Sequence, residues 1–326
     1  MQTVLVTGGA GYVGSHTCLA LAQAGFRPVV FDDLSNGHRE HVLWGPLEVG
    51  DVRDAGRLDA VFAAHQPVAV LHFAARIEVG ESVKNPGAFF DVNVGGAIAL
   101  IEAARRAGVN GLVFSSTCAT FGDPVRLPMA ETHPQAPLNP YGRSKLMVEQ
   151  ALADYDRYVG FRSTVMRYFN AAGADFEGRI GEWHEPETHA IPLAIQVALG
   201  QRPHFTIFGE DYGTRDGTAE RDYVHVLDLA DAHVLAVRRL LAGASSDSYN
   251  LGAGAGTTVR ELVDGVARVA GAPLAVRVAP RREGDAPALV ADNAKAREKL
   301  GWRPSRDLDA ILSSAWRWHS ALSAGG

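Results

Sequence analysis

The sequence predicts an α/β protein built on a doubly wound parallel sheet, and two observations carry that prediction. Short apolar runs alternate with longer stretches of helical periodicity through the first half of the chain, as strand–helix–strand units require. The apolar runs are nearly continuous, which is typical of strands that helices cover on both faces. The 326 residues are enough for about two domains, so we expect a smaller, mixed α/β C-terminal domain as well.

Five strands and four helices are predicted in the first domain. The apolar runs that predict strands are residues 3–7, 28–31, 68–73, 112–116 and 163–167. The stretches with apolar residues at helical spacing are residues 15–23, 57–65, 95–107 and 141–158. Gly25 and Gly108 follow two of these stretches closely, as expected at helix ends.

The second half of the chain has a different character. Glycine, proline and charged residues rise over 174–188 and 209–221, which predicts loops that close over a ligand. Residues 223–241 return to an apolar strand followed by a helix, so we expect the chain to rejoin the first domain there. Further helices are predicted over 259–270 and 309–320, and a strand over 275–278. The predicted domains are residues 1–169 plus about 222–252, which bind a cofactor, and 170–221 plus 253–326, which bind the substrate.

Composition and charge exclude several classes of protein. Hydrophobic residues make up 47% and charged residues 21%, which excludes a disordered or fibrous chain. The net charge is -6 without a basic cluster, so we expect no nucleic-acid partner. No apolar stretch reaches about 18 residues and no basic leader precedes the first strand, which predicts a cytoplasmic protein without a membrane anchor. Cys18 and Cys118 are the only cysteines and show no ligand spacing, so we expect no metal site.

A glycine-rich turn follows the first predicted strand. Gly8, Gly11 and Gly14 permit close approach of a pyrophosphate to backbone N–H groups, and the following helix N-terminus favours an anion. Asp32 ends the second strand, where its carboxylate would accept hydrogen bonds from ribose hydroxyls and repel a 2′-phosphate. These residues indicate a Rossmann-type domain that binds NAD rather than NADP. The alternative is that the turn only tightens a strand–helix corner; Asp32 and the strand–helix–strand setting argue against it.

Tyr141 and Lys145 lie four residues apart near the start of a predicted helix, with Asn139 as N-cap and Pro140 at its first position. This spacing brings an ammonium near the phenol and would lower a pKa that is ordinarily about 10. A tyrosinate can take the proton of a sugar hydroxyl whose carbon gives hydride to NAD. Thr117, at a preceding strand end, offers a hydroxyl to the same oxygen. The pair alone is usually an exposed helix pair, and its combination with the glycine turn favours catalysis.

With these motifs in view, the sequence resembles the extended short-chain dehydrogenase/reductase family from Val4 to about Trp318. The segments that carry the resemblance are TGGAGYVGSH at 7–16, HFAA at 72–75, VGESV at 79–83, YGRSKLMVEQ at 141–150, RYFNAAGA at 167–174, DGTAERDYVHVLDLADAH at 216–233, YNLGAG at 249–254 and PRREGD at 280–285. The similarity is greatest to the UDP-sugar 4-epimerases of that family. It implies NAD held through turnover, a UDP-sugar substrate and a homodimer. It also implies interconversion of UDP-glucose and UDP-galactose through a transient 4-keto sugar.

The resemblance assigns site residues as well. Tyr141 would be the acid and base, Lys145 its electrostatic partner, and Thr117 the hydroxyl that binds the reacting oxygen. The NAD-binding residues that it implies are Gly8, Gly11, Tyr12, Val13, Gly14, Asp32, Asn36, Asp51, Val52, Phe73, Ala74, Ala75, Asn93, Ser115, Tyr141, Lys145 and Tyr168. The substrate-binding residues that it implies are Thr117, Tyr141, Asn170, His189, Phe208, Arg221, Arg282, Asp285 and Leu289. The two arginines would clamp the diphosphate through bidentate hydrogen bonds, and Asp285 would accept from the uridine ribose.

Four positions bear on how closely this chain follows the family. His189 stands where some relatives carry Asn against the diphosphate, Phe121 where Tyr is common, and Ile77 where Lys often lies near the cofactor. Leu289 falls at a gate that is large in enzymes restricted to plain hexoses and small in those that accept N-acetyl sugars. UDP-xylose/UDP-arabinose and N-acetylhexosamine pairs therefore stay open as alternative substrates.

Two other functions are alternatives to 4-epimerisation for a chain with these motifs. A 4,6-dehydratase would need an Asp–Glu pair beside Thr117, where the chain has Cys118 and Ala119. A noncatalytic NAD-sensing binding module would have no need of the tyrosine, lysine and threonine hydroxyl. The sequence therefore favours the epimerase over both.

Overall fold

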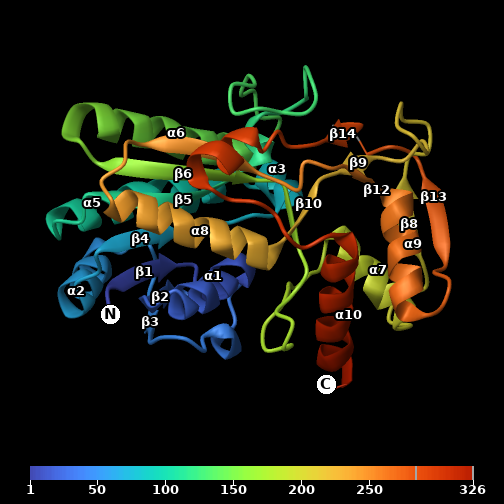
Figure 1. The fold of residues 1–326 in the computed structure, drawn as a ribbon, viewed down its shortest axis with the longest axis horizontal. Helices are drawn as coiled ribbons and strands as arrows, with labels where there is room; N and C mark the ends of the chain where they lie inside the picture. The colour runs from blue at the N-terminus through green and yellow to red at the C-terminus, as the bar shows by residue number, and fades with distance from the viewer. Residues whose placement is uncertain (283–284, 325–326) are drawn as a thin grey trace.

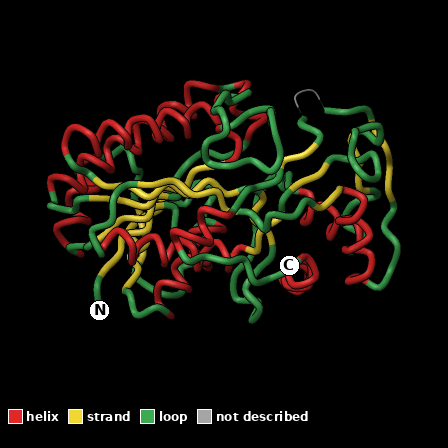
Figure 2. Tube along the Cα trace, turned by 45° about the horizontal axis from the view of Figure 1, so that its top comes forward, coloured by secondary structure: helices red, strands yellow, loops and turns green. Residues whose placement is uncertain are grey.

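The centre of the molecule is a seven-stranded parallel sheet with helices on both faces (Figures 1 and 2). The computed structural model describes residues 1–282 and 285–324. The strand order is β11-β6-β5-β4-β1-β2-β3, and every neighbouring pair is parallel. The order reverses between β1 and β4, where sheets of this kind bind dinucleotides. The predicted doubly wound, Rossmann-type fold is confirmed.

The elements around this sheet match the sequence predictions closely. Its strands are β1 (Thr3–Thr7), β2 (Arg27–Asp32), β3 (Leu47–Val49), β4 (Ala69–His72), β5 (Gly111–Thr117), β6 (Arg162–Tyr168) and β11 (Asp247–Leu251). The longer helices are α1 (Tyr12–Gln23), α2 (Ala55–His65), α5 (Gly96–Arg106), α6 (Pro140–Val159) and α8 (Val226–Leu241). Shorter helical segments are η1 (Arg39–His41), α3 (Val79–Lys84), α4 (Pro86–Phe89), η2 (Phe90–Gly95), η3 (Cys118–Thr120) and η4 (Ala296–Leu300). Strands β3 and β11 were not predicted, since one has three residues and the other is half polar.

Strand β1 contributes side chains to the hydrophobic core on each face of the central sheet. Helices α1 and α8 cover one face of the sheet, and α2, α5 and α6 cover the other (Figure 1). Val4 and Val6 of β1 pack in the core with α1 and α8, whereas Leu5 packs in the core with α2, α5 and α6. All three side chains are completely buried. Successive side chains of a strand alternate between faces, so a strand buried on both faces must be apolar throughout.

The helical stretch Pro86–Arg106 is long and apolar enough to cross a membrane by length and composition alone. Leu100 and Ile101 within it are fully buried, in the same core as residues of α2 and α6. Packing against the sheet therefore accounts for its apolar character.

A smaller group of elements lies beside the carboxyl ends of the central strands, on the right in Figure 1. Its helices are α7 (Ala190–Ala198), α9 (Val259–Ala270) and α10 (Leu308–Ala324). Its strands are β7 (Asn170–Ala172), β8 (Phe205–Phe208), β9 (Glu220–Arg221), β10 (Tyr223–His225), β12 (Thr257–Thr258), β13 (Val276–Ala279) and β14 (Ala288–Leu289). The chain returns to the central sheet through α8 and β11, while β10 pairs with β7 outside it. The exact domain boundaries stay a prediction.

Candidate active site

The turn between β1 and α1 is packed so closely that it requires glycine. Gly8 has φ of +73°, and a Cβ there would lie 2.4 Å from the backbone nitrogen of Ala74. A Cβ on Gly14 would lie 2.2 Å from the carbonyl oxygen of Gly8. Gly11 is the N-cap of α1, so the unpaired N–H groups of the first helical turn open beside the loop. This cradle fits the pyrophosphate of NAD.

Asp32 ends β2 and already accepts two backbone hydrogen bonds. One carboxylate oxygen lies 3.0 Å from the nitrogen of Ala10 and the other 2.9 Å from the nitrogen of Leu34. Burial raises the pKa of the carboxyl, against the effect of these bonds. A carboxylate has about four acceptor sites, so Asp32 braces the turn and retains capacity for ribose hydroxyls.

Most of the other predicted NAD residues lie at or just after the carboxyl ends of neighbouring strands, and Asn93 lies in η2. Asn93 joins the loop after β4 to α6, because it accepts from the nitrogen of Arg76 at 2.8 Å and donates to the Ser144 hydroxyl at 2.9 Å. The hydroxyl oxygens of Ser115 and Tyr168 are 2.5 Å apart. The remaining positions are Tyr12 and Val13 at the start of α1, Asn36 after β2, Asp51 and Val52 after β3, and Phe73 and Ala75 after β4.

Two of these residues make contacts that the sequence analysis did not predict. The Tyr12 hydroxyl donates to the carbonyl oxygen of Gly173 at 2.6 Å, which ties the glycine turn to the segment after β7. The Asp51 carboxylate forms an ion pair with Arg53.

Tyr141 and Thr117 meet where β5 ends and α6 begins. Asn139 caps α6 by accepting from the nitrogen of Gly142 at 2.8 Å, and Pro140 is the first helical residue, as predicted. Thr117 is the last residue of β5. Burial raises the pKa of Tyr141, although the Thr117 hydroxyl acts to lower it. The structure therefore places a phenol and a hydroxyl side by side at the end of the sheet.

Lys145 contacts the strand rather than the phenol. Its Nζ donates to the carbonyl oxygen of Ser115 at 2.9 Å, and the residue is 3% exposed. Burial lowers the pKa of Lys145 to about 7, while Glu149 acts to raise it. The prediction that Lys145 gives Tyr141 a low pKa is wrong for these side chains, because burial raises the pKa of the phenol and the ammonium is bound to a carbonyl oxygen instead.

A buried ion pair lies behind the lysine and was not predicted. Arg167 lies 2.6 Å from a carboxylate oxygen of Glu149, and both side chains are less than one-tenth exposed. Ser116 donates to the other carboxylate oxygen at 2.5 Å. Tyr141, Lys145 and Glu149 follow one another at intervals of four residues, so they share one helix face. This spacing is the sequence signal that could have indicated Glu149 as part of the site.

A cavity of about 400 Å³ collects most of the predicted substrate-binding residues. Those that line it are Asn170, His189, Phe208, Arg221, Arg282 and Asp285. The Arg221 guanidinium forms an ion pair with Asp285 and donates to the carbonyl oxygen of Ala286 at 2.9 Å. The Arg282 guanidinium lies 3.8 Å from the centre of the Phe208 ring, a cation–π contact. Two guanidinium groups in one cavity suit a diphosphate.

Leu289 lies next to this cavity, on β14. Its partner in the strand register is Arg221 of β9. The side chain packs with Phe121 and Met129, in a cluster that also includes Cys118, the residue after Thr117. Leu289 therefore lies beside Arg221, which lines the cavity, and in the cluster that holds Cys118, the residue after Thr117. Phe121 is fully buried, and Ile77 is 37% exposed.

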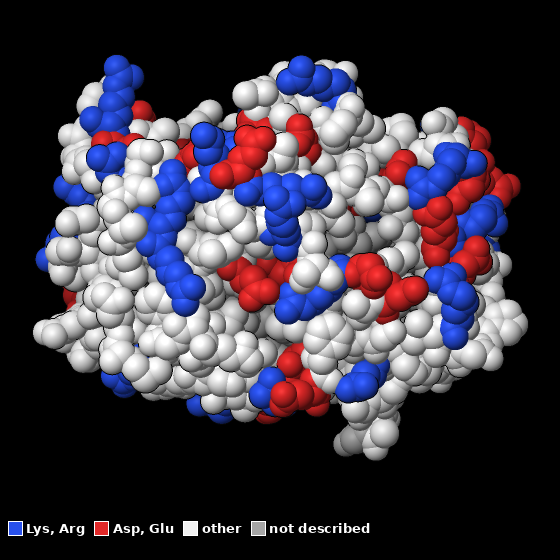
Figure 3. Space-filling model, in the orientation of Figure 1, with Lys and Arg blue, Asp and Glu red and all other residues white. Residues whose placement is uncertain are grey.

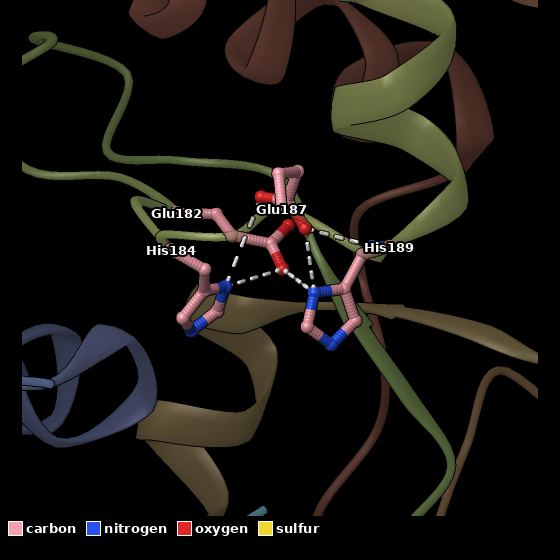
Figure 4. A group of neighbouring side chains, drawn as sticks. All are labelled: Glu182, His184, Glu187 and His189. Carbon is pink, nitrogen blue, oxygen red and sulfur yellow. Dashed lines mark hydrogen bonds and ion pairs between the residues drawn. The ribbon is translucent and has the colours of Figure 1, made fainter. Parts of the chain in front are cut away.

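Two further features escaped the sequence analysis. The buried carboxylate of Asp222 accepts from the backbone nitrogens of Ala253 and Ala291 at 2.6 and 3.0 Å, which joins the loop after β11 to that after β14. Burial raises the pKa of Asp222 to about 6. His189, considered alone in the sequence, shares a cluster with Glu182, His184 and Glu187 (Figure 4).

The surface charge of the molecule is mixed. On the face drawn in Figure 3, lysine and arginine side chains are interspersed with aspartate and glutamate. That distribution agrees with the net charge of -6.

Comparison with known proteins gives consistent matches along the chain. Residues 4–252 match the model of the NAD dependent epimerase/dehydratase family. The UDP-glucose 4-epimerase of Rhizobium leguminosarum bv. trifolii is 64% identical over 319 residues, which cover 98% of both chains. The structure of UDP-glucose 4-epimerase from Brucella ovis in complex with NAD is 48% identical, with a TM-score of 0.95 over 97% of this chain and 98% of that one. The enzyme of the same name from Stenotrophomonas maltophila, with bound NAD and formylated UDP-arabinopyranose, is 41% identical, with a TM-score of 0.98 over 100% of both chains.

Proposed function

The chain belongs to the NAD dependent epimerase/dehydratase family, and on that premise we propose that it interconverts UDP-glucose and UDP-galactose. It is an isomerase that inverts C4 of the sugar with bound NAD. The observation that carries this function is the full-length match to the Rhizobium UDP-glucose 4-epimerase. The cavity lined by Arg221 and Arg282 suits the diphosphate of such a substrate.

The residues of the glycine turn fit NAD, since a side chain at Gly8 or Gly14 would collide with backbone. Gly11 and the first turn of α1 would hold its pyrophosphate, and Asp32 its adenosine ribose. When bound, NAD supplies a hydride acceptor and donor for C4 of the sugar. Ser115 and Tyr168, near the carboxyl ends of β5 and β6, and Lys145 of α6 are proposed to hold its other end.

Tyr141 acts as the acid and base that transfers the proton of the C4 hydroxyl. Its phenol oxygen takes the proton of the C4 hydroxyl and returns it after inversion, while the Thr117 hydroxyl donates to the reacting oxygen. Because burial raises the pKa of the phenol, its ionisation needs a nearby positive charge. We propose that this charge would come from the nicotinamide cation of bound NAD, since the Lys145 ammonium is bound to the carbonyl oxygen of Ser115.

Inversion requires that the 4-keto sugar present both faces to one reactive centre. We propose that Arg221 and Arg282 hold the diphosphate, Asp285 the uridine ribose, and Asn170 and His189 the sugar nucleotide between them. Tight binding of the uridine and diphosphate leaves the hexose free to rotate about its diphosphate linkage. Few fixed contacts at the hexose end would favour this rotation.

We also propose that the enzyme is a cytoplasmic homodimer. The family resemblance supports both statements, and light scattering of the purified protein tests the second. UDP-glucose and UDP-galactose are the proposed pair. N-acetyl pairs, on which the size of Leu289 bears, and pentose pairs are the alternative substrates that the experiment below compares.

Product analysis tests the function. The purified protein, with no added cofactor, is incubated separately with UDP-galactose, UDP-xylose and UDP-N-acetylgalactosamine, and the products are separated by chromatography. We expect UDP-galactose to give UDP-glucose faster than either other sugar reacts. If no sugar reacts even after NAD is supplied, the assignment fails and a noncatalytic NAD-binding module becomes the better account.

A further inference from the structure

Two glutamates and two histidines from one loop and the start of α7 direct their polar atoms at a common point (Figure 4). Nδ1 of His189 is 2.9 Å from a carboxylate oxygen of Glu182 and 2.9 Å from one of Glu187. Nδ1 of His184 is 3.4 Å from Glu182 and 3.8 Å from Glu187. One ligand atom from each residue lies within 4.8 Å of all the others.

The charge of this cluster needs compensation. The side chains of Glu182 and Glu187 are only 6% and 5% exposed. Within residues 1–282 and 285–324, no lysine or arginine nitrogen lies within 4.0 Å of either carboxylate. Both carboxylates face His184 and His189, so either two protonated imidazoles or one bound cation must supply the positive charge that offsets the cost of burying them. Nδ1 of His184 is buried and has no hydrogen-bond partner in the described structure.

We propose that Glu182, His184, Glu187 and His189 bind one divalent transition-metal ion, with Zn²⁺ as the best fit. Imidazole and carboxylate ligands suit zinc, whereas Ca²⁺ and Mg²⁺ take oxygen ligands. Zinc bonds of about 2.0–2.2 Å place the corners of a tetrahedron roughly 3.4 Å apart. The four His–Glu separations of 2.9–3.8 Å bracket that value, and all four ligand atoms lie within 4.8 Å of one another. The ligands follow an E-x-H-x-x-E-x-H spacing, which a search based on cysteines does not find.

Four protein ligands leave no open position, so this ion is structural rather than catalytic. The loop that carries the ligands already contacts both parts of the molecule. Trp183 stacks on His38 with ring centres 3.9 Å apart, and Trp318 of α10 donates to the carbonyl oxygen of Glu182 at 3.0 Å. The His184 ring lies edge-on to Tyr12, 6.3 Å away at the start of α1. The ion would fix the loop between the glycine turn and α10.

The site also has a consequence for the neighbouring cavity. His189 lines that cavity, and its Nδ1 points to the glutamates. Metal bound at Nδ1 leaves the proton on Nε2, so the ring becomes a hydrogen-bond donor of fixed orientation. A donor there matches the anionic ligand that Arg221 and Arg282 favour. This consequence rests on the proposed function, whereas the metal site does not.

The direct test is the metal content of the purified full-length enzyme. Wild-type protein is incubated with Zn²⁺ in slight excess, passed through gel filtration, and analysed by mass spectrometry of the elements. His184→Gln and Glu187→Gln remove one ligand each. His65→Gln is the matched control, because it removes a histidine of α2 that lies outside the cluster. That histidine pairs with Glu48 of β3 at 2.6 Å. Circular dichroism and bound NAD report whether each variant is folded.

We expect about one zinc ion per chain in wild-type protein and in His65→Gln, and at least a tenfold lower content in the two ligand variants. Co²⁺ in place of Zn²⁺ should give wild-type protein the intense visible absorption of a four-coordinate ion. This second measurement needs no variant, so a variant that fails to fold does not affect it. Three results would overturn the proposal in favour of protonated ion pairs. They are folded wild-type protein that retains no zinc, a cobalt spectrum typical of six-coordination, and equal zinc content in wild type and folded ligand variants. Epimerase activity is not a readout, so failure of the proposed function is seen separately.

Discussion

The Nζ of Lys145 donates a 2.9 Å hydrogen bond to the backbone carbonyl oxygen of Ser115. Ser115 belongs to β5, the strand that ends at Thr117, and Lys145 lies one helical turn after Tyr141 in α6. This bond therefore fixes the start of the helix against the end of the strand. It holds Tyr141, one helical turn before the lysine, close to Thr117 at the end of the strand.

Burial of Lys145 predicts a specific dependence of stability on pH. The pKa falls from 10.5 to about 7 on folding, so between these values the unfolded chain binds more protons than the native one. Stability contributed at this site therefore rises with pH across that window, by up to about 1.4 kcal/mol per pH unit. Urea unfolding at several pH values should show this slope reduced in Lys145→Met. Lys84→Met, at an exposed lysine, should keep it. Parallel slopes in wild type and Lys145→Met would contradict the assignment.

Tyr141→Phe should lower kcat by about 10²- to 10⁴-fold, since it removes the acid and base. The aromatic ring is retained, so bound NAD and thermal stability should change little. Tyr158→Phe is the control on the same helix, at a residue that is 71% exposed, and should leave kcat unchanged. Steady-state kinetics with UDP-galactose measures both variants. Retention of more than a tenth of the wild-type rate by Tyr141→Phe would exclude the phenol as the base.

Arg221→Lys should weaken binding of UDP by about ten- to a hundredfold. Lysine keeps the charge but loses the planar fork that pairs with Asp285 and would pair with a diphosphate, and charged hydrogen bonds contribute about 1.5–3 kcal/mol. Isothermal titration calorimetry with UDP measures the change. Arg277→Lys, at an exposed position of β13, should bind UDP as wild type does. Equal affinities for the two variants would show that Arg221 does not hold the nucleotide.

Glu149→Gln should destabilise the fold by about 3–5 kcal/mol, because it leaves the buried Arg167 guanidinium without its counter-charge. Asp59→Asn breaks an ion pair with Arg106 in which both side chains are 49% exposed, and should cost less than about 1 kcal/mol. Urea unfolding compares the two variants. A loss as small in Glu149→Gln as in Asp59→Asn would mean that water reaches the buried pair.

Leu289→Tyr should lower the rate on UDP-N-acetylgalactosamine relative to UDP-galactose by roughly tenfold, since a larger side chain at the gate leaves less room for the acetamido group. Leu127→Tyr, at a residue that is 46% exposed, is the control for the added ring. Competition between the two sugars gives the ratio directly. An unchanged ratio in Leu289→Tyr would place the gate elsewhere.

The sequence predicted the parts of this molecule whose residues determine their own environment. Continuous apolar runs identified β1 because Val4, Leu5 and Val6 are buried on opposite faces of one strand. Strand β11 escaped notice because its polar residues are satisfied by tertiary contacts: Asn250 donates to the carbonyl oxygen of Met129 at 2.8 Å. The periodicity of the sequence does not show that Asn250 has a hydrogen-bond partner in a segment more than a hundred residues away.

The candidate site shows the same division. Residues in motifs, such as Tyr141 and Arg221, were identified from the sequence, and the structure brings most of the predicted substrate residues into one cavity. The direction of the Tyr141 pKa was wrong because helical spacing gives the distance between two groups and not their hydration. Glu182 and His184 were missed because each becomes notable only beside His189 in the folded loop.

Isotope retention at C4 tests the central claim most directly. UDP-galactose that carries deuterium at C4 is converted by the purified enzyme in ordinary water, and the UDP-glucose formed is analysed by mass spectrometry and NMR. Inversion through a 4-keto sugar held in the site predicts that the product retains deuterium at C4. Product with hydrogen at C4, or no product after NAD is supplied, would contradict that account.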